Sequence, residues 1–298
     1  MKESQGNTGF CTVTGYRDGA FFFHRVNHVC VQWTNQEAYM NLYAWNFEPT
    51  ILIALLVSTI GYVWITGPYA RSRGVQPAST LERNRFFLAI VFLFLALVSP
   101  IDTLSLVSLS MHMVQHLIMI VVVPPLIILS IPAEVGSLFL VNRTVLLILK
   151  SLLNPLLAFL VFNAIFVGWH LPANYDLAVR DQQVHVLEHV MFIFGALISW
   201  WPVFSHQPEL PRSTPGFLML FLFFMSLPPT IIGALLTFAG FVVYPAYEAV
   251  SRPWGMSAQA DQELAGLLMW LPGGLIYFVV LTVVFFRWFN RPGDDSMV

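Results

Sequence analysis

Long apolar runs, seven in all, recur through the chain after residue 48. A helix needs about 20 mostly apolar residues to cross the roughly 30 Å of hydrocarbon in a bilayer, and these runs have that length. The runs lie near 49–67, 86–107, 112–131, 151–170, 185–204, 216–240 and 264–286. The sequence therefore predicts an all-α, polytopic membrane protein, built as a bundle of seven transmembrane helices.

The composition also indicates a membrane protein. Hydrophobic residues make up 57% of the chain and charged residues only 10%, against about 25% charged residues in ordinary soluble domains. The net charge is −2 and the sequence has no basic stripe, so no nucleic-acid partner is expected. The lipid bilayer is the first partner that the sequence predicts.

We predict three parts in the chain: an extracytoplasmic N-terminal segment (1–48), a seven-helix membrane domain (49–290) and a cytoplasmic tail (291–298). The first segment is mixed polar and aromatic, and its pattern predicts no particular fold. It lacks the basic start, apolar core and small-residue cleavage site of a signal peptide. The first spanning helix is therefore expected to direct insertion.

Lysine and arginine fall unevenly on the two sides of the predicted bundle. Nine lie on one side: Arg71, Arg73, Arg83, Arg85, Arg143, Lys150, Arg212, Arg287 and Arg291. Five lie on the other: Lys2, Arg17, Arg25, Arg180 and Arg252. Because basic residues favour the cytoplasmic side, we predict an outside N-terminus and a cytoplasmic C-terminus.

Prolines and glycines interrupt three of the predicted helices. Kinks or broken turns are expected at Pro124-Pro125, at Pro228-Pro229 and at Pro272-Gly273-Gly274. Neighbouring helices would satisfy the carbonyls that such breaks free. Residues 132–143 are expected to form a short interfacial helix.

Five histidines fall at one depth, just inside the predicted outer interface. They lie in the first turns of the third helix, at the end of the fourth and at the start of the fifth: His112, His116, His170, His185 and His189. Polar groups at the edge of the hydrocarbon usually face protein and mark function. Residues four apart share a helix face, and imidazole binds several transition metals. These histidines predict a metal site.

Several other interpretations of this cluster stay open. The histidines could form polar caps at helix ends, with Met111 and Met113 as packing. His185-Val-Leu-Glu-His189 also fits the H-x-x-E-H pattern of zinc proteases, in which Glu188 is the general base. Glu188 could instead orient a ligand histidine as a hydrogen-bond acceptor. A haem site is disfavoured by the shallow depth, and a di-iron site by the absence of HH pairs.

Three aspartates lie on the same predicted side as the histidines. Asp102, Asp176 and Asp261 each suit a helix cap or a turn, and Asp261 is kept as a candidate metal ligand. The only cysteines are Cys11 and Cys30, ahead of the first apolar run. They could form a disulfide, or bind Cu(I) together with His24 and His28.

Several stretches, taken together, resemble the CtaG family of cytochrome c oxidase assembly factors. The resemblance covers residues 49–290, in order. It is carried by SPID (99–102), MHMVQHLIMIVVVPPLIILSIP (111–132), NPLLAFLVFNAIFVGWHLPANYD (154–176), VHVLEH (184–189), SWWPV (199–203), YPAY (244–247) and DQELAGLLMWLPGG (261–274). The family is distinct from the single-span periplasmic copper chaperone that sometimes shares its name.

The resemblance implies a seven-helix protein of the bacterial plasma (inner) membrane that is needed to mature haem–copper oxidase, with a role in copper delivery. The matching motifs carry over these positions as candidate metal ligands: His112, His116, His170, His185, Glu188, His189 and Asp261. The N-terminal 48 residues depart from the family pattern. They would suit a specialised partner or a permanent subunit of the oxidase.

We therefore expect a non-enzymatic assembly factor. It would bind copper, as Cu(I), at the histidine cluster and deliver it to cytochrome c oxidase subunits, receiving it from a donor protein on the outer side. One alternative is a metal-free accessory or scaffold subunit of the oxidase. A zinc-dependent intramembrane hydrolase is the other.

Overall fold

The computed structural model describes two strands at 20–26 and 29–34, and then residues 44–210, 213–248, 250, 252 and 254–290. The chain divides into two units, Met1–Ala44 and Trp45–Val298. In the first unit, strand β1 (Ala20–Val26) pairs antiparallel with β2 (Val29–Thr34). Cys11 and His28, and the side chains of His24 and Cys30, lie outside the described part, as do the roles predicted for them.

All the regular elements described in the second unit are helical, as the sequence predicts. Its α-helices are α2 (Pro49–Trp64), α3 (Ala70–Ser72), α4 (Thr80–Val98), α5 (Pro100–Ser105), α6 (Leu109–Leu117), α7 (Val123–Ile128), α8 (Ala133–Phe139), α9 (Arg143–Leu152), α10 (Pro155–His170), α11 (Pro172–Arg180), α12 (Gln182–Phe204), α13 (Pro215–Phe238), α14 (Ala258–Leu268) and α15 (Gly274–Phe289). Three π-helical turns, η1 (Ile65–Tyr69), η2 (Ile118–Val122) and η4 (Met269–Gly273), and one 3-10 turn, η3 (Pro245–Tyr247), complete it.

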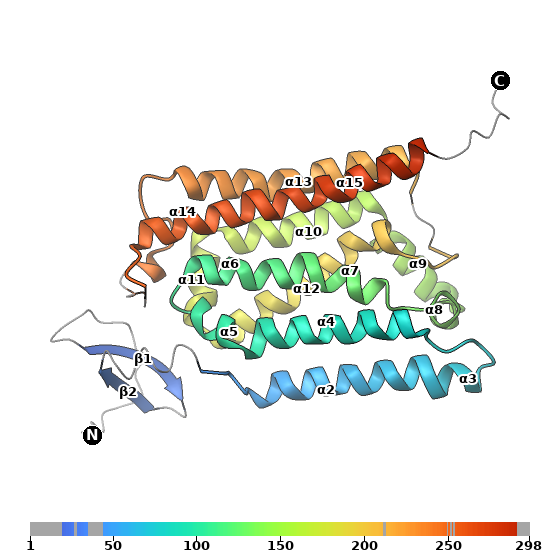
Figure 1. Cartoon of the computed structure of the whole chain (residues 1–298), viewed down its shortest axis with the longest axis horizontal. Helices are drawn as coiled ribbons and strands as arrows, with labels where there is room; N and C mark the ends of the chain where they lie inside the picture. The colour runs from blue at the N-terminus through green and yellow to red at the C-terminus, as the bar shows by residue number, and fades with distance from the viewer. Residues whose placement is uncertain are drawn as a thin grey trace. The chain divides into compact units, whose positions relative to one another are not determined.

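The long helices run side by side in this unit (Figure 1). Among the described residues, five helical stretches are long and apolar enough to cross a membrane, and the number rises to seven if two bent pairs each count as one span. These pairs are α8 with α9, bent by 114°, and α10 with α11, bent by 73°. The multi-pass helical fold is therefore confirmed, whereas the count of seven and the orientation of the termini stay predictions.

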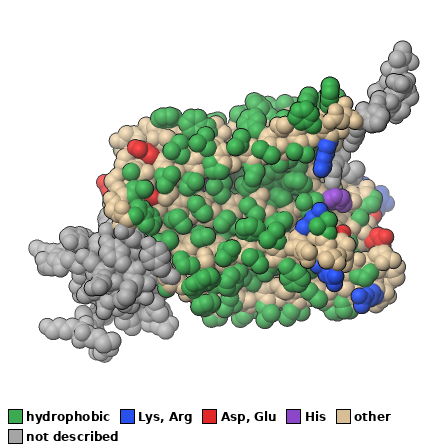
Figure 2. Space-filling view, viewed as in Figure 1, with side chains coloured by type: hydrophobic (Ala, Val, Ile, Leu, Met, Phe, Trp, Pro, Cys, Tyr) green, Lys and Arg blue, Asp and Glu red, His purple; other side chains and the backbone are tan. Residues whose placement is uncertain are grey.

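One face of the bundle shows the surface that a membrane protein needs. Hydrophobic side chains cover the flank, and lysines and arginines gather near one end of it (Figure 2). Basic residues occur in α3, at the start of α4, in α9 and in the last turn of α15, elements whose ends lie together in Figure 1. The histidine-bearing helix ends lie at the opposite end of the bundle.

The predicted second helix, 86–107, differs from the structure at both ends. It begins earlier, at Thr80, because Ser79 and Glu82 form a reciprocal capping box. It stops at Val98, because Ser99 is extended and the following Pro100 opens the separate helix α5. A proline has no N–H to donate to the carbonyl four residues back. The Gln115 side chain instead donates to that carbonyl, Ala96 O, at 2.9 Å.

Two of the three predicted proline interruptions coincide with π-helical turns. In the third predicted helix, η2 comes just before Pro124, and in the seventh, η4 contains Pro272. Trp200 Nε1 donates to Ile120 O at 2.8 Å, so a neighbouring helix does satisfy a carbonyl of η2. Helix α13, in contrast, runs without a break through Pro228 and Pro229.

The spans that contain α6 and α12 are the most buried of the five long apolar stretches, and α14 crosses α13 closely. A Cβ atom on Gly233 would lie 2.7 Å from Gly266 O, and one on Gly266 would lie 2.5 Å from Gly233 O. Only glycine permits this separation, which is the usual reason for small residues at membrane helix crossings. The crossing sets α14 against both α13 and α6, beside the histidines.

Candidate metal centre

Three helix ends meet to form the centre: the start of α6, the end of α10 and the start of α12. Ser108 caps α6 by accepting from Met111 N, and Asp181 caps α12 by accepting from Gln183 N and Val184 N. The segment Leu171-Pro172 ends α10, because Leu171 is extended and Pro172 begins α11. The chain thus places histidines of three helices at a common level.

Four side chains can offer ligand atoms to one ion: His112, His185, Glu188 and His189. One nitrogen or oxygen from each lies within 4.8 Å of the others, and all four side chains are buried. In a tetrahedral site with metal–nitrogen distances of about 2.0–2.1 Å, the ligand atoms lie about 3.3 Å apart. A contraction of at most about 1.5 Å between any two of these atoms would therefore close the four around an ion.

His116 lies directly beside these four residues. Its Nε2 is 4.0 Å from Glu188 Oε1, and its ring centroid lies 4.2 Å from that of His112 and 5.4 Å from that of His189. We call His112, His116, His185, Glu188 and His189 the histidine–glutamate group. The structure thus brings together five of the seven predicted ligand residues.

The polar atoms of this group are buried and unsatisfied. Within the described part of the chain, seven of them have no hydrogen-bond partner: His112 Nε2, both ring nitrogens of His116, His185 Nε2, both oxygens of Glu188 and His189 Nε2. Buried polar groups in proteins are nearly always paired, and a buried carboxylate without a partner is costly. A cation bound among these atoms would remove the deficit for the whole group at once.

The ring of His112 is oriented by Tyr247. The Tyr247 hydroxyl donates to Ser105 O at 2.8 Å and lies 3.4 Å from His112 Nδ1. Because the hydroxyl proton is directed at Ser105, Nδ1 of His112 is the donor to the tyrosine oxygen. The lone pair of the neutral ring is then on Nε2, the nitrogen that faces the group, as is usual for ligand histidines.

Three tyrosines cover the end of the group. Tyr175 and Tyr244 stack at 4.1 Å between ring centroids, and Tyr175 lies 5.3 Å from the His112 ring. The Tyr244 hydroxyl donates to His170 O at 2.9 Å. Burial raises the pKa of Tyr244 and of Tyr247 above the usual value, so both remain protonated donors at neutral pH.

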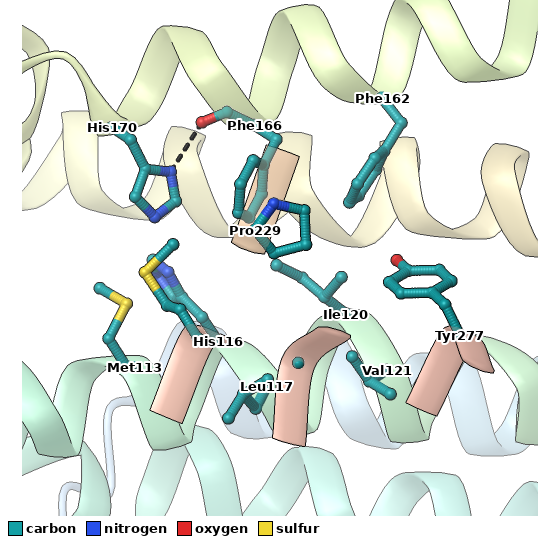
Figure 3. A pocket seen from close by; sticks show the side chains of 12 residues that line it. Met113, His116, Leu117, Ile120, Val121, Phe162, Phe166, His170, Pro229 and Tyr277 are labelled. Carbon is teal, nitrogen blue, oxygen red and sulfur yellow. Dashed lines mark hydrogen bonds between the residues drawn. The ribbon is translucent and has the colours of Figure 1, made fainter. Parts of the chain in front are cut away.

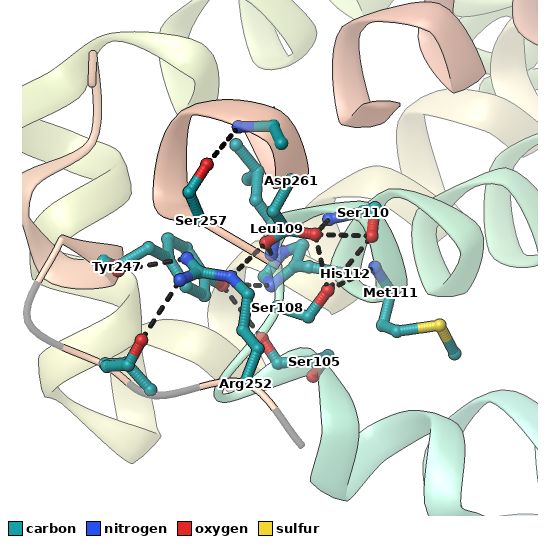
Figure 4. Close-up of polar contacts among 12 residues, drawn as sticks. Ser105, Ser108, Leu109, Ser110, Met111, His112, Tyr247, Arg252, Ser257 and Asp261 are labelled. Atoms are coloured by element: carbon teal, nitrogen blue, oxygen red, sulfur yellow. Dashed lines mark hydrogen bonds and ion pairs between the residues drawn. The ribbon is translucent and has the colours of Figure 1, made fainter. Parts of the chain in front are cut away.

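Asp261 lies outside the group and has a different environment. Its Oδ1 accepts from the Ser108 hydroxyl at 2.8 Å and from the Ser110 hydroxyl and amide at 2.6 and 3.3 Å. Its Oδ2 accepts from Leu109 N at 2.7 Å and from Arg252 Nε at 2.9 Å (Figure 4). Asp261 thus adds to the Ser108 cap by accepting from the first amides of α6, and both of its oxygens already accept hydrogen bonds.

His170, the seventh predicted ligand, also lies apart from the four-residue set. Its Nδ1 is 2.7 Å from Phe166 O. A carbonyl oxygen can only accept, so Nδ1 carries the proton. The lone pair is then on Nε2, which has no partner within the described residues.

The other two aspartates hold structural positions. Asp102 accepts from Asn46 Nδ2 at 2.8 Å and from Gln115 Nε2 at 2.9 Å. Asp176 pairs with Arg180 at 3.5 Å on the surface of α11. Neither aspartate is a helix cap: Ser99 caps α5 ahead of Asp102, and Asp176 lies inside α11.

Sequence reasoning missed the residues that support the group. Tyr175, Tyr247 and Arg252 are each nearly fully buried, and the Arg252 guanidinium also donates to Val250 O and Tyr247 O at 3.0 Å. The stretch YPAY (244–247) pointed to this loop, but no spacing rule links Tyr247 to His112, which lies 135 residues earlier in the chain.

Fold and site together define a class: a multi-pass helical membrane protein with a buried histidine–glutamate group at one end of its bundle. Residues 60–291 match the family described as cytochrome c oxidase caa3 assembly factor (Caa3_CtaG). The chain belongs to this family of cytochrome c oxidase assembly factors, as its motifs suggest.

Curated relatives are distant and carry no functional name. The chain is 23% identical over 265 residues to an uncharacterized protein of Mycobacterium leprae, covering 82% of this chain and 39% of the relative. It is 24% identical over 264 residues to uncharacterized proteins of Mycobacterium bovis and Mycobacterium tuberculosis, covering 83% of this chain and 40% of each. The chain thus spans about two fifths of the length of these relatives. No solved structure matches.

Proposed function

We propose that the chain serves oxidase assembly by binding Cu(I) at the histidine–glutamate group and passing it to a cytochrome c oxidase subunit. The observation that carries the proposal is the set of seven buried, unpartnered nitrogen and oxygen atoms in these five neighbouring side chains, four of which can each offer one atom to a single ion. The family membership supplies the oxidase as recipient. The chain acts as a carrier in this proposal and catalyses no reaction.

The charge of the group favours a monovalent ion. Glu188 is the single carboxylate, and the other candidate ligands are imidazoles, which bind metals in their neutral form. Cu(I) with one carboxylate and neutral histidines has no net charge, whereas Zn²⁺ or Cu²⁺ leaves one positive charge in a buried site. Uncompensated charge is expensive at the edge of hydrocarbon, so the monovalent ion is the better match.

The placement of the group suits transfer. A site made of side chains from α6 and α12 lies at a helix end rather than halfway along the bundle, so a small ion has a short path to it although a bulky substrate has little access. We place this end on the outer side of the bacterial plasma membrane, because basic residues gather at the other end of the bundle. A donor protein outside the cytoplasm would then supply the ion, and the oxidase would receive it.

The experiment that tests the proposal is elemental analysis of the purified full chain, as isolated and after anaerobic Cu(I) loading. The double variant His185→Ala/His189→Ala is compared with the His206→Ala variant, which removes an imidazole outside the group. We expect copper to bind the wild type and His206→Ala, and the double variant to lose the copper of the histidine–glutamate group. Equal copper content in all three proteins would contradict the proposal.

A metal-free scaffold is the second candidate, and helix α2 favours it. No residue of α2 itself is buried, and large apolar side chains such as Ile53, Val57 and Ile60 are exposed. Such a helix has room for a partner helix as well as for lipid. Co-purification of the oxidase with the double histidine variant, together with fully copper-loaded oxidase, would favour the scaffold.

A zinc-dependent hydrolase is the third candidate, because Glu188 lies with His185 and His189 as the H-x-x-E-H pattern requires. The side chains of the group are at most 8% exposed, which leaves little access for a peptide or lipid substrate. Glu188→Gln removes the base and keeps the shape. Two results together would favour hydrolysis. The purified protein would contain zinc, and a strain that carries Glu188→Gln would fail to mature its oxidase although that oxidase contains its normal copper.

A further inference from the structure

A small cavity lies inside the bundle next to the histidine–glutamate group. It has a volume of about 30 Å³ and is lined by side chains that include Met113, His116, His170, Met269 and Tyr277 (Figure 3). A space of about 10–15 Å³ is enough for one water-sized particle. The cavity therefore has room for a single small occupant.

Two histidines present unpartnered nitrogens at this cavity. His170 donates from Nδ1 to Phe166 O, which leaves the Nε2 lone pair without a partner among the described residues. Both ring nitrogens of His116 are also unpartnered there. Figure 3 shows both rings, from α10 and α6, lining the same space. The cavity is thus apolar over most of its wall, with two unsatisfied imidazoles.

Two thioethers complete the set. Met113 is 1% exposed and Met269 is 4% exposed, and both line the cavity. Methionine alone is ordinary core packing. Beside two unsatisfied imidazoles a methionine is also a candidate metal ligand, because thioether sulfur selects Cu(I) over harder ions.

We propose that His116, His170, Met113 and Met269 form a second Cu(I) site, which shares only His116 with the histidine–glutamate group. All four ligands are neutral, so this site lacks the carboxylate that compensates charge in the first. It is therefore the weaker of the two and excludes divalent ions more strongly. The inference rests on the proposed function, because it assumes that Cu(I) reaches this end of the bundle.

His116 connects the two sites. Its Nε2 is 4.0 Å from Glu188 Oε1, and its ring also lines the cavity. An ion bound by the histidine–glutamate group can exchange one ligand at a time and move into the cavity while His116 remains bound to it. The copper stays Cu(I) throughout, and no proton or electron is transferred to the protein by this exchange.

The test is anaerobic titration of the full chain in detergent with Cu(I) against a Cu(I)-specific chelator, followed by X-ray absorption at each stoichiometry. We expect a first copper with nitrogen and oxygen neighbours and a second, weaker copper with sulfur neighbours. Met113→Leu/Met269→Leu should abolish the second copper and its sulfur signal and leave the first unchanged. Met119→Leu is the matched control, since Met119 is equally buried but packs in a separate cluster against α4.

The outcomes separate this inference from the proposed function. One copper bound without sulfur neighbours at saturation, in the wild type, overturns the second site and leaves the first intact. No bound copper at all overturns both. Because the wild-type spectrum decides the matter by itself, a variant that fails to fold does not block the test. Sulfur neighbours that persist in Met113→Leu/Met269→Leu would also overturn the assignment.

Discussion

Two buried carboxylates at the same end of the bundle have opposite surroundings. Asp261 accepts five hydrogen bonds, one of them from a buried arginine. Glu188 is equally buried and accepts none from the described residues. The hydrogen bonds of Asp261 indicate a structural role. The lack of hydrogen bonds to Glu188 indicates that its carboxylate binds something other than the described residues, such as a cation.

The largest effect should follow removal of the compensated carboxylate. Asp261→Ala leaves the buried Arg252 without its carboxylate partner, and Leu109 N and Ser110 N without an acceptor, so we expect a loss of roughly 3–5 kcal/mol in the free energy of unfolding. Thermal or denaturant unfolding in detergent measures it. If Asp261→Ala kept wild-type stability and lost copper instead, the roles that we assign to the two carboxylates would be reversed.

Glu188→Gln should show the opposite profile. We expect Cu(I) affinity to fall about 10–100-fold, as for loss of a group that supports a metal site. The metal-free variant should unfold no more easily than the metal-free wild type, because a buried amide is less costly than an unpaired carboxylate. Competition titration and unfolding curves of both forms measure the two effects. A large loss of stability in the metal-free variant would mean that Glu188 has a structural partner.

Tyr247→Phe should affect both regions slightly. The hydroxyl lies 3.4 Å from His112 Nδ1 and donates to Ser105 O, while the Tyr247 carbonyl accepts from Arg252. We expect a loss of about 1 kcal/mol in unfolding free energy and about a 10-fold loss in Cu(I) affinity. Unchanged affinity would show that the His112 ring needs no orienting partner.

Asp176→Asn should give the smallest effect. Its pair with Arg180 lies at the surface, where the arginine is largely exposed, so we expect a change of at most about 1 kcal/mol in stability. Copper binding should not change. A loss of Cu(I) affinity as large as that of Glu188→Gln would show that any acidic residue near this end influences copper binding. The contrast between Glu188 and Asp261 would then not be specific.

The histidine–glutamate group could be predicted largely from the sequence. The i,i+4 spacing of His112 with His116 and of His185 with His189 fixes a shared helix face, and the alternation of spanning helices fixes a shared end of the bundle. These two rules need no knowledge of side-chain contacts, and the residues they select do lie together.

The role of Asp261 could not be predicted in the same way. A carboxylate in the first turn of a helix fits a cap and a ligand equally well, and the choice depends on which donors surround it. Ser108 and Arg252 supply those donors from outside α14. The contact between α14 and α6 depends in turn on the close crossing at Gly233 and Gly266, which single-sequence periodicity does not reveal.

The break at Ser99-Pro100 illustrates a limit of hydropathy. The apolar run from 86 to 107 is continuous in composition, so it predicts one helix. The chain nevertheless turns at Ser99, and the Gln115 side chain satisfies the carbonyl that Pro100 leaves open. A free carbonyl is costly in a bilayer, so the break depends on Gln115, which lies on another helix, α6.

The two π turns η2 and η4 have a consequence for how these helices can evolve. Each π turn holds about one residue more than an α turn, and one residue rotates the rest of a helix by about 100°. The extra residue changes the orientation of α7 relative to α6, which carries the proposed ligands His112 and His116, and that of α15 relative to α14. In each of these two spans, the buried face of the first helix is therefore oriented independently of the buried face of the second. The ligand set can change at one end without repacking the apolar half that holds the bundle together.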